Sequence, residues 1–205
     1  VIGVDYPLSP EARYPVALDQ TLALLDWLAS DAGRAIGVDP ARLAIGGDSA
    51  GANIAVAAAL RLRDAGAPDR LSGLLLNYGG FGAPCSAEAE ARFGGPGAVL
   101  DSAEMDYYFA NYAGEAWASL DDPYARPILA DPQSLPPAFF VIPECDILAE
   151  QSHAMAARMK AAGVEVTSTV YPGATHSFLE AMSIAEVARR AIADGAAWVK
   201  AKLRA

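Results

Sequence analysis

A serine between small residues is the side chain best placed for chemistry in this sequence. Gly47-Asp48-Ser49-Ala50-Gly51 follows the apolar run 43–46 and precedes a helical pattern that starts at residue 52. This is Gly-x-Ser-x-Gly in the strand, turn and helix context that exposes a serine hydroxyl. Small flanking residues let the strand and the helix approach closely, and N–H groups at the start of the helix face a developing oxyanion. The pattern predicts Ser49 as a nucleophile and the Ala50 N–H as an oxyanion donor.

Two partners for this serine follow it in the chain. Asp146 comes after the apolar run 138–143, and His176 lies in a glycine-containing loop after the run 164–171. A serine hydroxyl needs an imidazole to take its proton, and the imidazole needs a carboxylate to fix its tautomer. The order serine, acid, histidine is that of the α/β-hydrolases. Because each residue follows a strand, the three side chains are expected to converge.

Apolar runs and helical patterns alternate along the rest of the chain. The strands and helices that they predict would position Ser49, Asp146 and His176. Strands are predicted over 1–6, 42–46, 71–77, 138–143 and 164–171, and helices over 16–32, from 52 to about 65, over 150–162 and in the last 20 or so residues. The last helix presents one apolar face: Ile184, Val187, Ala191, Ile192, Gly195, Trp198 and Val199. This alternation predicts an α/β fold, a mostly parallel sheet with helices on both faces.

The segment from about 81 to 131 interrupts the alternation. It contains Gly94-Gly95-Pro96-Gly97 and an aromatic cluster of Tyr107, Tyr108, Phe109, Tyr112 and Trp117. We interpret it as a small lid-like insertion. Its aromatic residues could shape an acyl or alcohol pocket, although such a cluster more often serves packing. Asp101 and Glu104 are predicted to begin a helix.

Composition narrows the classes of partner. The 205 residues are 53% hydrophobic and carry a formal net charge of −10, which argues against nucleic acid or an anionic membrane. No apolar run approaches the roughly 18 residues that a membrane span needs. Cys85 and Cys145 form no disulfide framework, and no signal peptide is visible, so a cytoplasmic location is expected.

Four segments resemble a known family: DYPLSPE at 5–11, GDSAGAN at 47–53, ECDIL at 144–148 and GATHSF at 173–178. They are similar to the hormone-sensitive-lipase family of esterases, and the whole chain is most similar to bacterial acetyl esterases. The resemblance implies an α/β-hydrolase fold with Ser49, Asp146 and His176 as catalytic triad. It also implies hydrolysis of short-chain acyl esters, a small-molecule ester as partner and no cofactor or metal. A homo-oligomer remains open.

One departure from the family concerns the oxyanion hole. The family has a His-Gly-Gly-Gly loop upstream of the strand that matches residues 1–6, and this sequence contains no such loop. The family topology also places a further strand between those that match 1–6 and 42–46. We therefore expect residues 1–205 to be the C-terminal portion of one α/β-hydrolase domain that lacks N-terminal strands. The expected remnant is five-stranded, with a break or an exposed edge beside the first strand.

Two other functions stay open from the residues. The same triad could act on amides, thioesters or peptides, or the fold could be an inactive binding protein or fragment. Among other polar residues, His153 is expected to be a surface or half-buried histidine on a helix, and Asp48 could be a solvated or capping carboxylate as readily as a catalytic one. Asp5 and Glu144 are expected to form structural hydrogen bonds.

Overall fold

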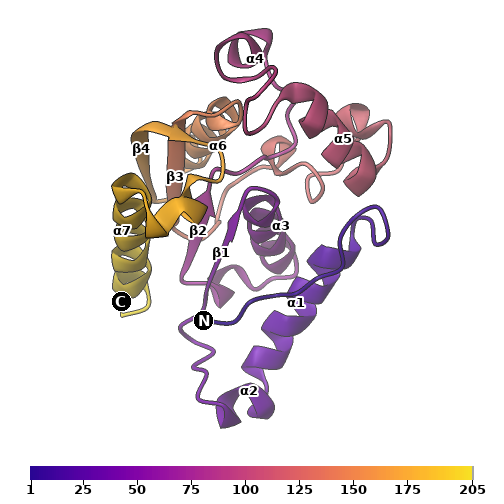
Figure 1. The fold of residues 1–205 in the computed structure, drawn as a ribbon. Helices are drawn as coiled ribbons and strands as arrows, with labels where there is room; N and C mark the ends of the chain where they lie inside the picture. Colours follow the sequence, from indigo (N-terminus) through magenta and orange to yellow (C-terminus); the bar gives the residue numbers. More distant parts are fainter. Residues whose placement is uncertain (205) are drawn as a thin grey trace.

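The computed structural model describes residues 1–204, and its core is a parallel sheet. Within these residues the sheet has four strands: β1 (Ala44–Asp48), β2 (Gly73–Asn77), β3 (Ala138–Cys145) and β4 (Val166–Thr175). They are hydrogen-bonded in the order β1-β2-β3-β4, and every adjacent pair is parallel. The carboxyl ends of all the strands therefore meet at one edge of the sheet (Figure 1).

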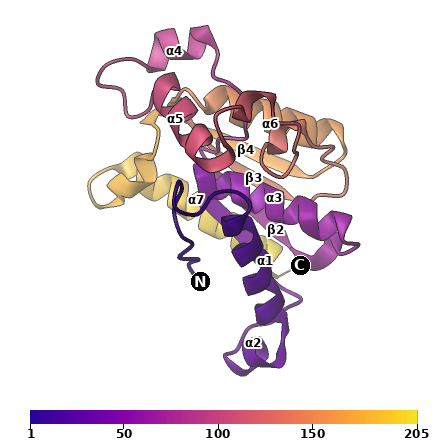
Figure 2. The same cartoon turned by 90° about the vertical axis from the view of Figure 1, so that its right-hand side faces the viewer.

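Helices cover both faces of this sheet, as the sequence predicts. The helices α3 (Ala50–Asp64) and α6 (Ala149–Ala161) pack on one face, and α1 (Val16–Ala29) lies outside α3. The long helix α7 (Glu186–Lys202) packs on the opposite face (Figure 1). Leu74 and Leu76 face α3 and α6, whereas Leu75 contributes to the cluster beneath α7, because side chains alternate along a strand. The short helix α2 (Asp31–Ala35) lies with the end of α1 away from the sheet (Figure 2).

The segment predicted as an insertion lies between β2 and β3. It contains α4 (Ala87–Phe93), α5 (Ser102–Ala113) and the 3₁₀ turns Trp117–Ser119 and Pro127–Leu129. Its apolar side chains pack on Ile147 and Leu148, just after β3, so the segment stands over the carboxyl ends of the strands (Figure 1). Asp101 begins α5 in a capping box with Glu104, which confirms the predicted helix start.

The predicted strand over residues 1–6 is wrong. These residues form no strand, Val1 to Asp5 are exposed, and the sheet accordingly has four strands within residues 1–204 rather than five. A strand needs a hydrogen-bonding neighbour, and β1 pairs only with β2 in the part of the chain described. The outer edge of β1 is therefore open within the described residues, whereas the prediction placed a break or an exposed edge beside a strand at residues 1–6.

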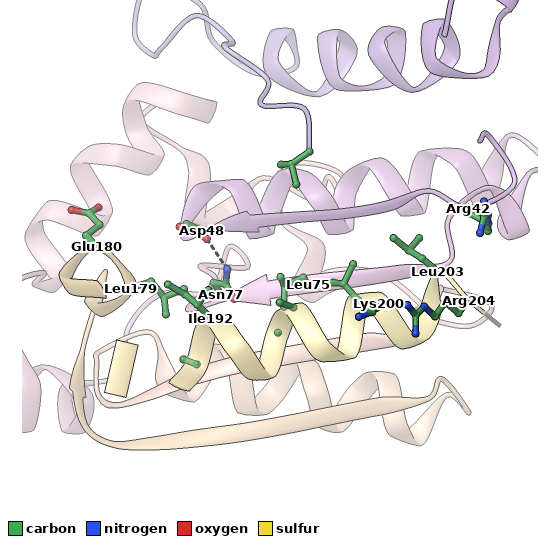
Figure 3. Close-up of a pocket in the computed structure, with 15 residues that line it drawn as sticks. Arg42, Asp48, Leu75, Asn77, Leu179, Glu180, Ile192, Lys200, Leu203 and Arg204 are labelled. Atoms are coloured by element: carbon green, nitrogen blue, oxygen red, sulfur yellow. Dashed lines mark hydrogen bonds between the residues drawn. The ribbon is translucent and has the colours of Figure 1, made fainter. Parts of the chain in front are cut away.

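A groove lies beside this open edge, between β1, β2 and α7 (Figure 3). Its volume is about 820 Å³, and Leu75, Ile192 and Val199 give it an apolar wall. Of the predicted apolar face of the last helix, Ala191 and Gly195 are buried, whereas Ile184 precedes α7 and is 85% exposed. No helix within residues 1–204 is long and apolar enough to cross a membrane.

Candidate active site

Ser49 occupies a sharp turn between β1 and α3. Its φ is 53° and its ψ is −111°, a backbone conformation that residues other than glycine rarely adopt. Ser49 N–H donates to the Asn77 carbonyl at 2.9 Å, which ties the turn to the end of β2. The side chain is only half-buried, so its hydroxyl stands at the carboxyl edge of the sheet.

His176 lies between the other two predicted residues. Its Nε2 is 3.0 Å from Ser49 Oγ, and its Nδ1 is 2.8 Å from Asp146 Oδ2. Both distances fall within the range of a hydrogen bond, about 2.6–3.2 Å. The three side chains therefore meet although 127 positions separate Ser49 from His176 along the chain.

The hydrogen bonds define one tautomer of the imidazole. Asp146 is 3% exposed and its other oxygen accepts from the Leu148 N–H at 2.8 Å, so the carboxylate is fixed at both oxygens. An ionised carboxylate can only accept, so Nδ1–H donates to Asp146 and Nε2 is left to accept from the Ser49 hydroxyl. Proton transfer from Oγ to Nε2 would produce a serine alkoxide beside an imidazolium that Asp146 stabilises.

Ala50 is the first residue of α3 and is exposed at the elbow. The first N–H groups of a helix have no carbonyl partner inside the helix, and they lie at its positive end. Within residues 1–204, the glycines of the 81–131 segment lie after the nucleophile in the chain, and the loop that the family places upstream has no counterpart. Ala50 N–H is therefore the candidate oxyanion donor within the described residues.

A pocket of about 370 Å³ opens at Ser49 and Ala50. One wall comes from residues 6–9 near the start of the chain and another from α5, where Tyr107, Tyr108 and Tyr112 contribute aromatic rings. The aromatic cluster of the insertion is thus divided in its roles. Phe109 and Trp117 stack at 4.6 Å within a buried cluster, whereas Tyr107 and Tyr108 are exposed at the pocket.

Two residues that the sequence analysis did not select, Asn77 and Tyr78, lie next to this site. Asp48 Oδ1 accepts from Asn77 Nδ2 at 2.7 Å, and Asp48 Oδ2 accepts from the Tyr78 hydroxyl at 3.1 Å (Figure 3 shows the bond to Asn77). The ring of Tyr78 packs edge-on with the imidazole of His176, with 5.2 Å between centroids. The signal that could have revealed them is their position at the carboxyl end of the strand adjacent to β1.

The remaining polar candidates lie away from the triad chemistry. His153 is exposed on α6, as expected for a surface histidine. Glu144 accepts from the Gly173 N–H at 2.8 Å, the structural hydrogen bond that was expected, whereas Asp5 is exposed. Burial raises the pKa of the Cys85 thiol to about 12, with Glu150 adding to the rise, so this thiol stays protonated. Across residues 1–204, no three His, Cys, Asp or Glu side chains form a metal-binding group.

A parallel sheet with a serine elbow, a histidine and a buried acid after successive strands defines the α/β-hydrolase class. A family model described as "alpha/beta hydrolase fold" matches residues 1–180. The chain belongs to this family.

Curated relatives lie among bacterial esterases. The chain is 37% identical over 192 residues to an ethyl acetate hydrolase of Pseudomonas putida, an alignment that covers 92% of this chain and 58% of the relative. It is 32% identical over 206 residues to an acetyl esterase of Salmonella choleraesuis, covering 100% of this chain and 63% of the relative. These relatives confirm the resemblance to bacterial acetyl esterases. The chain spans about three fifths of their length.

Solved structures of esterases share the fold. A hyperthermophilic esterase of the archaeon Pyrobaculum calidifontis superposes with a TM-score of 0.89 at 30% identity, over 98% of this chain and 64% of that one. A thermostable esterase of Pseudomonas putida superposes with a TM-score of 0.89 at 34% identity, over 98% of this chain and 63% of that one. The match extends over nearly all of the chain and confirms the α/β-hydrolase fold.

Proposed function

We propose that this chain carries the catalytic residues of a serine carboxylesterase that hydrolyses short-chain acyl esters, acetyl esters among them. The observation that carries the proposal is the continuous line of hydrogen bonds from Ser49 through His176 to Asp146, 3.0 Å and 2.8 Å long. The acetyl esterase and ethyl acetate hydrolase among the relatives support the choice of substrate class.

The reaction proceeds through an acyl-enzyme. Ser49 Oγ attacks the ester carbonyl carbon while His176 Nε2 takes the hydroxyl proton. The tetrahedral intermediate collapses when the imidazolium returns that proton to the departing alkoxide, which leaves as an alcohol. Water then attacks the acyl-serine with His176 as general base, and the acid product leaves with Ser49 restored. Asp146 keeps its negative charge throughout and stabilises the imidazolium.

The negative charge on the carbonyl oxygen needs backbone donors. Ala50 N–H is one of them, since it begins α3 next to the nucleophile. We propose that residues 1–205 are the C-terminal portion of a single α/β-hydrolase domain, and that upstream residues of the complete protein supply the other donors. The 81–131 segment serves as a lid over the pocket, a role that its position above Ser49 and its contribution to the pocket wall support.

The test of the nucleophile uses the complete protein with p-nitrophenyl acetate. Ser49→Ala should lower kcat by a factor of about 10⁴ or more, and a fluorophosphonate probe should label Ser49 alone, as found by peptide mapping. Ser9→Ala is the matched control, because Ser9 lines the same pocket while its hydroxyl donates to the Ala12 carbonyl. Activity that survives Ser49→Ala would reject the assignment.

The substrate class is tested separately. Given the small pocket at Ser49, p-nitrophenyl acetate and butyrate should be hydrolysed with higher kcat/KM than p-nitrophenyl palmitate or an acetanilide. A preference for palmitate would indicate a lipase, and faster cleavage of the anilide would indicate an amidase. Loss of all ester turnover in the complete protein, with the fold intact, would favour a binding protein.

We also propose a cytoplasmic location. Both Cys85 and Cys145 are free thiols within the described residues, which suits a reducing compartment. Fractionation of the source cells should recover the esterase activity with cytoplasmic markers, and recovery in a secreted fraction would contradict the proposal.

A further inference from the structure

Asp48, the residue before the nucleophile, is bonded by Asn77, the last residue of β2, and by Tyr78, the residue that follows β2. One of its carboxylate oxygens accepts from Asn77 Nδ2 at 2.7 Å and the other from the Tyr78 hydroxyl at 3.1 Å. Asp48 and Asn77 are also register partners of the parallel pair β1 and β2. Asp48 itself is exposed, and its carboxylate links the last residue of β1 to the last residue of β2 and to the start of the loop that follows.

Tyr78 is held in an unusual position by this arrangement. It is 1% exposed, its φ is +39°, and its N–H donates to the Val141 carbonyl at 2.9 Å. Burial raises the pKa of its hydroxyl, and the negative charge of Asp48 raises it further, so the hydroxyl stays protonated and donates to Asp48. A bulky residue at positive φ is strained, and it persists only where its surroundings hold it.

The ring of Tyr78 forms a side wall for the imidazole. The two rings meet edge-on, with centroids 5.2 Å apart and planes at 66°. The ring of Phe178 also packs edge-on with the ring of Tyr78, with 6.1 Å between their centroids. Asp146 and Ser49 contact the edge of the imidazole at its two nitrogens. The ring of Tyr78 instead packs beside the imidazole, where it limits rotation of the imidazole away from Ser49 and Asp146.

Such a wall matters because one of the two edge contacts is lost during the reaction. Once Ser49 Oγ is acylated, it has no proton to donate to Nε2, and only the bond to Asp146 and the packing hold the imidazole. A misplacement of the base by about 1 Å can lower the rate by about a hundredfold.

We propose that Asp48 and Tyr78 form a brace that positions His176, with Asp48 acting through the Tyr78 hydroxyl. This inference rests on the proposed esterase function and assigns two positioning residues to it. Neither residue transfers a proton or contacts the acyl group. The Asp48 carboxylate thereby couples the strained turn at Ser49 to the imidazole of His176.

The experiment compares two tyrosine variants of the complete protein. Tyr78→Phe keeps the ring and removes the bond to Asp48. Tyr171→Phe is the matched control, because its hydroxyl donates to Asp194 at 2.9 Å in the same buried cluster while its ring packs on Phe178. We expect Tyr78→Phe to lower kcat about tenfold with KM unchanged, and Tyr171→Phe to leave kcat unchanged at a similar loss of thermal stability.

A double-mutant cycle tests whether Asp48 acts through Tyr78. The loss of kcat in the double variant Asp48→Ala with Tyr78→Phe should be no larger than that of the worse single variant. Both changes break the same bond between Tyr78 and Asp48, and the loss of the Asn77 bond is already part of Asp48→Ala. Asp48→Asn should retain most of the activity, since an amide can still bond both Asn77 and Tyr78. Additive losses in the cycle, or equal kcat values for the two tyrosine variants, would overturn the brace.

A readout independent of turnover separates this inference from the proposed function. The low-field proton resonance of His176 Nδ1–H reports the bond to Asp146, and Tyr78→Phe should shift or broaden it while Tyr171→Phe leaves it as in the wild type. A wild-type protein without ester hydrolysis would overturn the esterase proposal, and the resonance would still decide the brace. An unchanged resonance in Tyr78→Phe would reject the brace.

Discussion

Residues of the proposed triad differ in their contact with solvent, and this difference follows their roles. Ser49 is half-buried, as a nucleophile that must meet a substrate requires, whereas His176 is 8% and Asp146 3% exposed. Burying an ionised carboxylate is costly unless it is hydrogen-bonded, and Asp146 accepts from both His176 and the Leu148 N–H. The acid is therefore held by its own loop as well as by its partner.

Two buried tyrosines, Tyr78 and Tyr171, and the half-buried Tyr112 are expected to make the stability of the folded state depend on alkaline pH. Burial raises the pKa of Tyr78, Tyr112 and Tyr171 above the ordinary value of about 10. The contribution of these tyrosines to the free energy of unfolding is fully present below about pH 10. Above it, the unfolded state loses protons that the folded state keeps. The free energy of unfolding should then fall by up to about 1.4 kcal/mol per pH unit for each tyrosine.

Thermal unfolding of the complete protein between pH 8 and 11 checks this expectation. Tyr171→Phe should make the decline in melting temperature shallower, because one tyrosine with a raised pKa is removed. Tyr107→Phe, at a ring that is 64% exposed, should keep the wild-type profile. A melting temperature that stays constant across this range would contradict the prediction.

At the scale of elements, the elbow between β1 and α3 depends on one close approach. A Cβ on Gly47 would lie 2.7 Å from Gly51 Cα and still closer to the Gly51 carbonyl, so the strand and the helix could not keep their positions. A Cβ on Gly51 would meet nothing within 4 Å in the described chain. The two glycines of the pattern are thus unequal: the first is required by sterics, and the second has space around it.

Gly47→Ala should therefore destabilise the protein by about 1–3 kcal/mol or more and lower esterase activity, because the overlap involves backbone that cannot move aside. Gly51→Ala is the matched variant and should stay close to wild type in urea unfolding. Equal destabilisation by both variants would show that residues outside 1–204 fill the space beside Gly51.

For the whole molecule, the outer edge of β1 and the apolar groove beside α7 are the features that the described chain leaves uncovered. Arg42, Lys200 and Arg204 stand at one end of this groove (Figure 3). An open strand edge next to apolar side chains favours association and binding of hydrophobic molecules. Relatives that are longer than this chain have additional residues available to cover such a surface.

Residues 1–205 expressed alone should bind a hydrophobic dye and hydrolyse p-nitrophenyl acetate about 10²–10³ times more slowly than a chain extended upstream in its reading frame. The reason is that Ala50 N–H would face the oxyanion without the upstream donors. Dye fluorescence and turnover of both chains, each with its Ser49→Ala variant as background, provide the measurement. Parent-like turnover with cooperative unfolding would show that this chain already contains all the donors it needs.

The sequence by itself determined the local features of this protein. The nucleophile pattern and the periodicity of α6, α7 and β3 are properties of neighbouring residues, and these elements are found nearly as predicted. The order of Ser49, Asp146 and His176 along the chain can likewise be read from the sequence. The resemblance to a family added the fold, because it covers the chain from residue 5 to residue 178.

Only the tertiary structure decided which segments pair and which side chains meet. Residues 1–6 have the composition of a buried strand, yet a strand exists only when a neighbour accepts its hydrogen bonds, and the described chain places none there. The contact of Tyr78 with His176 and its bond to Asp48 likewise depend on the parallel register of β1 and β2. Periodicity reports on residues a few positions apart, whereas these contacts join residues tens of positions apart that meet only once the sheet has formed.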